Sequence, residues 1–251
     1  MYEILKIGVV AEGPTDVIVI KDIVANLCGD REFVITTLQP ECSVAFEQYN
    51  GMTGTGWSGV CRWIHVLKEQ TNKFSDNPLW NNFPIIILHL DTDTIDQTYK
   101  KGRLGHLTDV YGNLPYQGNK HCGIKKSERC QNTCDLSRER VNALRKILCG
   151  WIGEHVPDNL IFCTPVESTD AWVLAAFFPN NNLIKNGQLE CRLGTFRILE
   201  TQKREKRIKK TTSDYLEKVA EKFQQRWSQV CQLSFEASRF SDDLMKAIST
   251  K

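Results

Sequence analysis

The chain has 251 residues, 41% of them hydrophobic, and its 32 Lys and Arg residues nearly balance 30 Asp and Glu residues, for a formal net charge of +2. This length and composition favour one α/β domain with an elaboration over two independent domains. The near-neutral charge excludes binding of a polyanion through a global positive field, so any nucleic-acid contact must come from local clusters of cations.

Neither an export signal nor a membrane span is evident in the sequence. No stretch approaches 18 consecutive apolar residues, and the N-terminal MYEILKIGVV runs into a predicted strand without a cleavage-site pattern. We therefore expect a cytoplasmic protein with no membrane partner. The ten cysteines are scattered over a mid-sized chain, which favours buried free thiols and one metal site over a disulfide framework.

Four apolar, β-branched runs alternate with four helical patterns along the chain. This alternation predicts a parallel sheet with crossover helices, so the expected fold class is α/β. The third run, PIIILHL, is apolar on both faces, which indicates a central strand covered by helices and makes His89 a core residue without a function. The predicted strands span 4–11, 32–39, 83–91 and 159–165, and the predicted helices span 15–27, 58–72, 136–150 and 168–177.

Two segments fall outside this alternation. Residues 94–135, after the third strand, are rich in Gly, Asn and Lys and too long for an ordinary connection, which is typical of a lid, a binding loop or a metal-tied knuckle. Residues 200–251 begin with a charge run and continue with apolar residues at helical spacing, for which TSDY offers an N-cap. We expect one α/β domain over 1–199, with 94–135 as its insertion, and a basic helical extension over 200–251.

Acidic residues follow the predicted strands at the sheet edge where open α/β sheets bind ligands. Asp91 and Asp93 are two residues apart, so they project to the same side if strand geometry persists. So many carboxylates at one edge repel one another unless a cation intervenes, and oxygen ligands suit Mg²⁺ or Mn²⁺. The residues are Glu12 and Asp16 after the first strand, Asp91, Asp93 and Asp96 after the third, and Glu167 and Asp170 after the fourth.

Turns and helix N-termini offer a second explanation for acidic residues at these positions. Asp and Glu side chains cap free backbone N–H groups there and interact favourably with the helix dipole. For Asp16, Asp96 and Glu167 taken singly, this explanation is as good as a metal site. Glu12, Asp91 and Asp93 taken together favour the metal site.

Two sequence motifs that contain these acidic residues resemble those of a known family. VVAEGPTD at the end of the first strand and LDTDT at the end of the third resemble the Toprim domain of topoisomerases, bacterial primases and nucleases of overcoming-lysogenization-defect type. The nearest likeness is to small stand-alone Toprim proteins of bacterial defence loci, the RloB-like group, in which an acidic residue begins an apolar helix as Asp170 does in STDAWVLAAF. The resemblance covers roughly residues 4–178 and excludes the insertion and the tail.

The resemblance implies a four-stranded parallel sheet in which the first and third strands are neighbours. It implies that Asp91 and Asp93 hold Mg²⁺ or Mn²⁺ and that Glu12 completes the site or acts as general acid/base. Asp170, together with Glu167, would supply a second metal. The residue after EGPT is Asp16 where the family more commonly has Glu, which leaves its role as a ligand open. The implied metal ligands are Glu12, Asp16, Asp91, Asp93, Glu167 and Asp170.

The function implied is that of a metal-dependent endonuclease of prokaryotic antiviral defence, which hydrolyses phosphodiester bonds of DNA or RNA. A metal that bridges a phosphate oxygen and a water can activate both, so clustered carboxylates on a rigid sheet suffice without a protein nucleophile. An ATPase or another defence-system subunit is the implied protein partner. The alternative is a noncatalytic Toprim-like module that binds nucleic acid or a partner, but the full set of acidic residues argues against decay of the site.

The insertion contains four residues of metal-binding type. His121, Cys122, Cys130 and Cys134 lie within fourteen residues, and tetrahedral Zn²⁺ can tie down such a segment. The C-x₇-C-x₃-C spacing matches no standard knuckle, and two adjacent ligands would strain a closed site. A structural zinc site and an untethered lid with ordinary thiols are therefore both open.

The charge run QKREKRIKK carries six cations against Glu205, a local charge of +5. Such a run is either a solvated helical face or, beside a metal-carboxylate site, a surface that attracts a phosphate backbone in a salt-dependent way. The candidate nucleic-acid-binding residues are Lys203, Arg204, Lys206, Arg207, Lys209 and Lys210.

Overall fold

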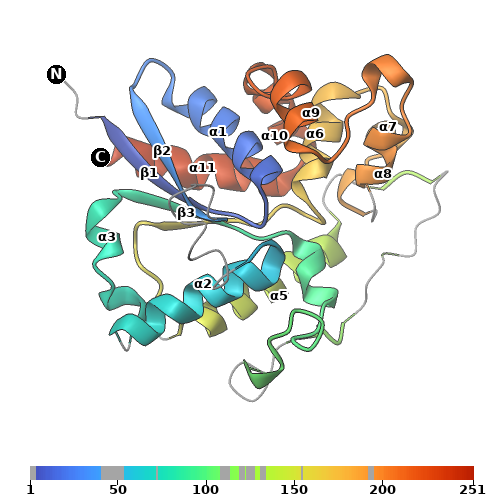
Figure 1. The fold of residues 1–251 in the computed structure, drawn as a ribbon. Coiled ribbons are helices and arrows are strands. Elements are labelled where there is room, and N and C mark those ends of the chain that lie inside the picture. Colours follow the sequence, from blue (N-terminus) through green and yellow to red (C-terminus); the bar gives the residue numbers. More distant parts are fainter. Residues whose placement is uncertain are drawn as a thin grey trace.

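The fold is a parallel sheet with helices on both faces (Figure 1). The computed structural model describes residues 4–40, 54–71, 73–107, 114–118, 122, 128–130, 134–153, 155–191 and 195–251. Within these residues, four strands have the order β2-β1-β3-β4. The predicted α/β class is confirmed, as is the expectation that the first and third strands are neighbours. The strands are β1 (Leu5–Val10), β2 (Phe33–Gln39), β3 (Ile85–His89) and β4 (Leu160–Cys163).

The register of the central strands fixes where their carboxyl ends meet. Val10 of β1 lies opposite Leu88 of β3, and His89 of β3 lies opposite Cys163 of β4. β3 is buried along its whole length, as predicted for a strand with helices on each side. Because β1, β3 and β4 are parallel and end in step, the turns that leave them start at the same edge of the sheet.

Alternate residues of each strand enter two separate hydrophobic clusters. Ile85 and Ile87 pack in one cluster, whereas Ile86 and Leu88 pack in the other, as the period of two in a strand requires. The helices of the first cluster include α1 (Pro14–Cys28), α6 (Thr169–Phe177), α8 (Thr195–Glu200) and α11 (Phe235–Ser249). Those of the second are α2 (Gly56–Thr71) and α5 (Asp135–Ile152), beside α3 (Leu79–Asn82) (Figure 1).

The start of α1 follows from local chain chemistry. Pro14 stands at the first helical position, where its fixed φ angle suits the helix and its missing N–H is not needed. The helix ends before Gly29, whose φ of 56° lies in the left-handed region that glycine tolerates best. Asp16 therefore falls in the first turn of α1, where it is 2% exposed.

The C-terminal segment is helical, but its helical pattern over 211–230 is interrupted. The N-cap of α9 (Thr212–Lys218) is Thr211, whose hydroxyl accepts a hydrogen bond from the Asp214 N–H. This residue immediately precedes the TSDY in which the N-cap was predicted. Glu221 then adopts a φ of 65°, which a continuous helix does not allow. The remaining elements here are η6 (Arg204–Lys206), η7 (Gln224–Arg226), α10 (Trp227–Leu233) and α11.

The apolar side of this C-terminal segment packs into the cluster that holds α1. Tyr215, Phe223 and Trp227 are each at most 1% exposed and belong to that cluster. Residues on both sides of position 200 thus share one hydrophobic core. Two short helices, α7 (Asn182–Lys185) and η5 (Leu189–Cys191), lie between α6 and α8 in the chain. None of the helices among the described residues has the length and apolar composition needed to cross a bilayer.

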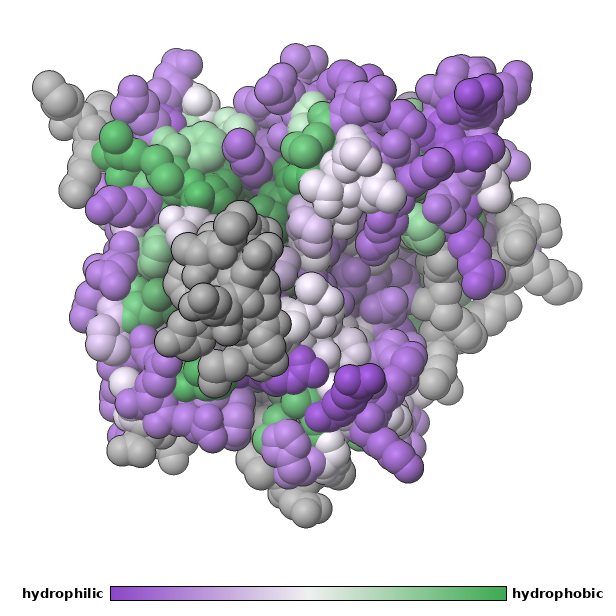
Figure 2. Space-filling model, viewed as in Figure 1, coloured by the Kyte–Doolittle hydropathy of each residue, from purple (hydrophilic) through white to green (hydrophobic). Residues whose placement is uncertain are grey.

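The surface on the face seen in Figure 1 is mainly hydrophilic (Figure 2). Hydrophobic residues gather over β1 and β2 at the upper left of the view. β2 is an edge strand, and its Val34 is 52% exposed. The carboxyl edge of the sheet, in contrast, is surrounded by polar and charged side chains.

Candidate active site at the carboxyl edge of the sheet

The turn after β1 places Glu12 against the end of β3. Oε1 of Glu12 accepts a hydrogen bond of 2.7 Å from the Asp91 backbone N–H and one of 3.3 Å from the Thr94 hydroxyl. Glu12 is thereby held beside Asp91, as the neighbouring positions of β1 and β3 led us to expect.

Asp91 and Asp93 do not continue the strand. β3 ends at His89, and Asp91 immediately precedes the 3₁₀ helix η3 (Thr92–Asp96). The Pro165 carbonyl accepts hydrogen bonds from the Thr92 N–H (3.2 Å) and the Thr92 hydroxyl (2.6 Å), which ties this turn to the one after β4. The condition under which Asp91 and Asp93 would project to the same side, persistent strand geometry, is therefore not met. Asp91 is buried and Asp93 is exposed, but both line the same cavity.

This cavity, which we call the acidic cavity, has a volume of about 410 Å³. It lies where the turns after β3 and β4 face each other. Its cationic lining consists of Arg197 and Lys210. Its acidic lining consists of Asp91, Asp93, Asp96, Glu167 and Asp170.

Glu167 has two features that set it apart from an ordinary turn residue. Its φ of 63° lies in the left-handed region, which is uncommon for any residue other than glycine. Its Oε2 atom is buried and makes no hydrogen bond to any described residue. Oε1 lies 3.6 Å from Nε of Arg140, a side chain that α5 contributes. A strained backbone that holds an unpartnered carboxylate oxygen in a cavity is typical of a binding position.

Arg140 also accounts for Asp96. Its Nη2 atom lies 2.9 Å from Oδ2 of Asp96, and Arg140 itself is 1% exposed. For Asp96, capping and metal binding were equally good explanations of the sequence. The structure gives it an arginine partner.

A buried group of Asp16, His89 and Asp91 lies behind the cavity. One ligand atom from each lies within 4.8 Å of the others, and Nε2 of His89 is 3.1 Å from Oδ1 of Asp91. Thr169 donates from its hydroxyl to Asp16 (2.5 Å) and from its N–H to Asp91 (3.2 Å). His89 is fully buried, as predicted, but it also contacts a site carboxylate, which the sequence analysis missed.

Burial and crowding raise the pKa values of several of these acids. Burial, with the charge of Asp91, raises the pKa of Glu12 well above its usual range. Desolvation by the surrounding protein, with the charge of Asp91, raises the pKa of Asp93 to about 7. Desolvation likewise raises the pKa of Glu167 to about 7. Burial alone would lower the pKa of His89, but Asp16 and Asp91 raise it to about 9. The carboxylates thus outnumber the positive charges available to them.

The C-terminal segment supplies two partners of Asp170. Nζ of Lys210 lies 2.8 Å from Oδ2 of Asp170, and the buried Tyr215 hydroxyl donates to Oδ1. Lys210, predicted to contact nucleic acid, is thus paired with a carboxylate of the acidic cavity. No local signal in the sequence predicts either contact, since 40 or more residues separate the partners.

The other cations of the charge run lie on a surface that is not a regular helical face. Only one 3₁₀ turn, η6, forms within the run, and Arg207 is half-buried beside the buried Ile208. The exposed cations that could meet a phosphate backbone are Lys203, Arg204, Lys206 and Lys209.

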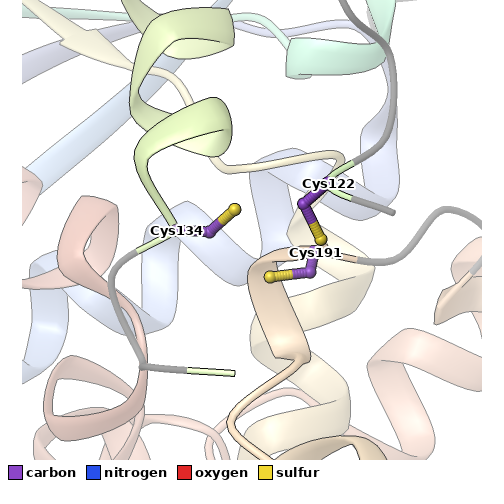
Figure 3. A group of neighbouring side chains, drawn as sticks. All are labelled: Cys122, Cys134 and Cys191. Atoms are coloured by element: carbon purple, nitrogen blue, oxygen red, sulfur yellow. The ribbon is translucent and has the colours of Figure 1, made fainter. Parts of the chain in front are cut away.

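The thiols of the insertion form a separate group. Cys122 and Cys134 lie with Cys191 of η5, and their sulfur atoms are within 4.8 Å of one another (Figure 3). Cys130 joins them through a contact of 3.3 Å with the Cys191 sulfur. His121 lies outside the described residues. The sequence analysis did not identify Cys191, because no local spacing relates it to the other three.

Comparisons with known proteins do not identify a family for this chain. No protein-family model matches the chain, and neither the curated proteins nor the solved structures gave a match. What the arrangement can do follows from its chemistry: several carboxylates and two cations line one cavity on a rigid sheet, and a buried histidine contacts one of these carboxylates. Such a set can bind a divalent cation, hold a phosphate group and transfer protons.

Proposed function

We propose that the acidic cavity binds Mg²⁺ or Mn²⁺ and that the protein hydrolyses phosphodiester bonds of DNA or RNA. The observation that carries the proposal is the convergence of carboxylates from the turns after β3 and β4 on one cavity, with Glu12 from the turn after β1 bound to the same segment. The further placement in prokaryotic antiviral defence, beside an ATPase or another subunit, rests on the sequence resemblance alone.

The residues present fit a divalent metal. The unpartnered Oε2 atom of Glu167 is an oxygen ligand without a cation, and Asp91 and Asp93 line the cavity beside it. We assign the metal to these three residues. Asp170 is a poorer ligand, because its two oxygens already contact Lys210 and Tyr215. Asp16 is likewise engaged by Thr169.

The remaining residues have roles that follow from their positions. A bound divalent metal would polarise a phosphate group and lower the pKa of a water molecule. Glu12 accepts its two hydrogen bonds at Oε1, which leaves Oε2 to take up or release a proton, and burial beside Asp91 raises the pKa of Glu12, which favours the protonated form that can act as a general acid. Arg197 and Lys210 place positive charge at the cavity, where they would orient a phosphate group.

One observation favours the noncatalytic alternative. Three of the aspartates already have a cationic partner within the protein: His89 for Asp91, Arg140 for Asp96 and Lys210 for Asp170. An acidic site that protein cations neutralise does not require a metal. In that case the cavity would be a structural remnant of a module that binds nucleic acid or a partner.

The test combines metal binding with cleavage. Calorimetric titration of Mn²⁺ and incubation with labelled single- and double-stranded DNA and RNA, each with and without Mg²⁺ or Mn²⁺, would be done on wild type, Asp93→Asn and Glu167→Gln. Loss of a ligand should weaken metal affinity by at least about 10-fold and abolish metal-dependent cleavage.

Asp158→Asn is the matched control, because Asp158 is exposed and lies next to the start of β4, at the opposite edge of the sheet. It should leave both measurements unchanged. Nucleic-acid binding without cleavage, together with no Mn²⁺ binding by the wild type, would establish the noncatalytic module instead.

A further inference from the structure

Four cysteine side chains from two separate segments of the chain lie together outside the acidic cavity. Cys122, Cys130 and Cys134 belong to the insertion, with Cys134 immediately before α5, and Cys191 ends η5. The sulfur atoms of Cys122, Cys134 and Cys191 point toward a common centre in Figure 3 and lie within 4.8 Å of one another. The Cys130 sulfur is 3.3 Å from that of Cys191.

These distances correspond to the ligand set of one metal ion. A Zn–S bond of about 2.3 Å places the sulfurs of a tetrahedral site about 3.8 Å apart. A disulfide joins only two sulfurs, at about 2.05 Å, and leaves two further thiols at the centre unexplained. A multi-iron cluster needs its cysteines further apart, because each binds a different iron atom. Three sulfurs at this spacing, with the sulfur of Cys130 in contact with one of them, therefore favour a single tetrahedral ion.

We propose that Cys122, Cys130, Cys134 and Cys191 bind one structural Zn²⁺ ion. Cys191 takes the place of His121 in the ligand set expected from the sequence. This set removes the difficulty of two adjacent ligands, because Cys122 then binds without its neighbour. Four protein ligands leave no open position, so the zinc has a structural and not a catalytic role.

The same segments are already connected by backbone hydrogen bonds. The Cys130 N–H donates to the Asn186 carbonyl (2.8 Å), and the Ser137 hydroxyl donates to the Glu190 carbonyl. The zinc ion would therefore fix the insertion to the start of α5 and to η5. α5 also carries Arg140, so the ion would lie at the start of the helix that supplies the cationic partner of Asp96 beside the acidic cavity.

The experiment is elemental analysis of protein purified under reducing conditions without chelator, followed by replacement of the metal with Co²⁺. The wild type should contain about one zinc per chain, and the cobalt form should show the thiolate charge-transfer absorption and strong d–d bands of tetrahedral coordination. Cys191→Ser should lose the zinc. His121→Ala and Cys149→Ser, the latter at a half-buried thiol on α5, should keep it.

Several results would overturn the proposal. They are zinc retained by Cys191→Ser but lost by His121→Ala, iron in place of zinc, a disulfide among the four cysteines, or reduced wild type that binds neither zinc nor cobalt. If Cys191→Ser fails to fold, the intensity of the charge-transfer band in the wild type still counts the thiolate ligands. Fewer than four thiolates would then contradict the ligand set. None of these measurements depends on nuclease activity, so the zinc site and the acidic cavity are tested separately.

Discussion

Replacement of Tyr215 by Phe removes one buried hydrogen bond and little else. The Tyr215 side chain is 1% exposed, and its hydroxyl donates to Oδ1 of Asp170, which is also 1% exposed. Burial and the charge of Asp170 raise the pKa of Tyr215, so the hydroxyl remains a donor at all ordinary pH values. The ring, which packs in the cluster of α1 and α11, is retained in the variant, so no cavity forms.

The expected cost follows from the charge of the acceptor. A hydrogen bond to a charged group contributes about 1.5–3 kcal/mol, because its loss leaves that group buried without a partner. Lys210 still contacts the other carboxylate oxygen, 2.8 Å away, so the middle of this range applies. We expect Tyr215→Phe to lower the free energy of unfolding by about 2 kcal/mol. For a protein of this size, that corresponds to a fall in Tm of about 6 °C.

The assay is equilibrium unfolding in urea, followed by circular dichroism in magnesium-free buffer that retains zinc. A double-mutant cycle with Asp170→Ala isolates the hydrogen bond from other effects of the substitution. In the Asp170→Ala background, Tyr215→Phe should cost almost nothing, because the hydroxyl has lost its acceptor. A cost below about 0.5 kcal/mol in the wild-type background, or an equal cost in both backgrounds, would refute the reasoning.

Three further predictions concern the core, the acidic cavity and the charge run. Ile87→Ala, at a fully buried position of β3, should lower the free energy of unfolding by about 2–5 kcal/mol, whereas Val34→Ala on the exposed edge of β2 should change it by no more than about 0.5 kcal/mol; urea unfolding measures both. Arg140→Gln leaves Asp96 and Glu167 without their cation, so the Tm measured by calorimetry without Mg²⁺ should fall. Addition of Mg²⁺ should raise the Tm of the variant more than that of the wild type, and an equal rise would argue against a metal in the cavity. Changing the exposed Lys203, Arg204 and Lys206 to Ser should weaken nucleic-acid binding for all sequences, as measured by fluorescence anisotropy. The slope of log affinity against log salt should fall by about 1 for every phosphate that the variant no longer neutralises. An unchanged slope would show that the run is a solvated surface.

The sheet could be predicted because its signals are local. Each strand is an apolar, β-branched run, and each crossover helix has its own periodicity and N-terminal residues, as Pro14 shows for α1. The position of Glu12 beside Asp91 followed from the strand order that the resemblance implied. The break at Glu221 could not be predicted, since tertiary packing of α9 on α1 and of α10 on α6 overrides the local helical pattern.

The parts of the site that escaped prediction all depend on contacts between distant residues. Lys210 and Tyr215 meet Asp170 only because the C-terminal helices fold back over α1 and α6. Cys191 is 57 residues after Cys134, so no spacing rule relates them. His89 was assigned to the core from its apolar neighbours, and a strand residue that is both buried and at the edge of a site gives the same pattern.

The two partners of Asp170 also determine when the surroundings of this carboxylate are completed during synthesis. The ribosome produces the sheet and all the proposed metal ligands before it produces Lys210 and Tyr215, which follow Asp170 by 40 and 45 residues. Until those residues emerge and α9 packs on α1, the Asp170 carboxylate has neither its lysine nor its tyrosine. A nascent chain that stops short of Tyr215 would therefore carry the acidic residues in an unfinished arrangement, and the proposed phosphodiesterase would gain its activity only after Lys210 and Tyr215 have been synthesised and packed.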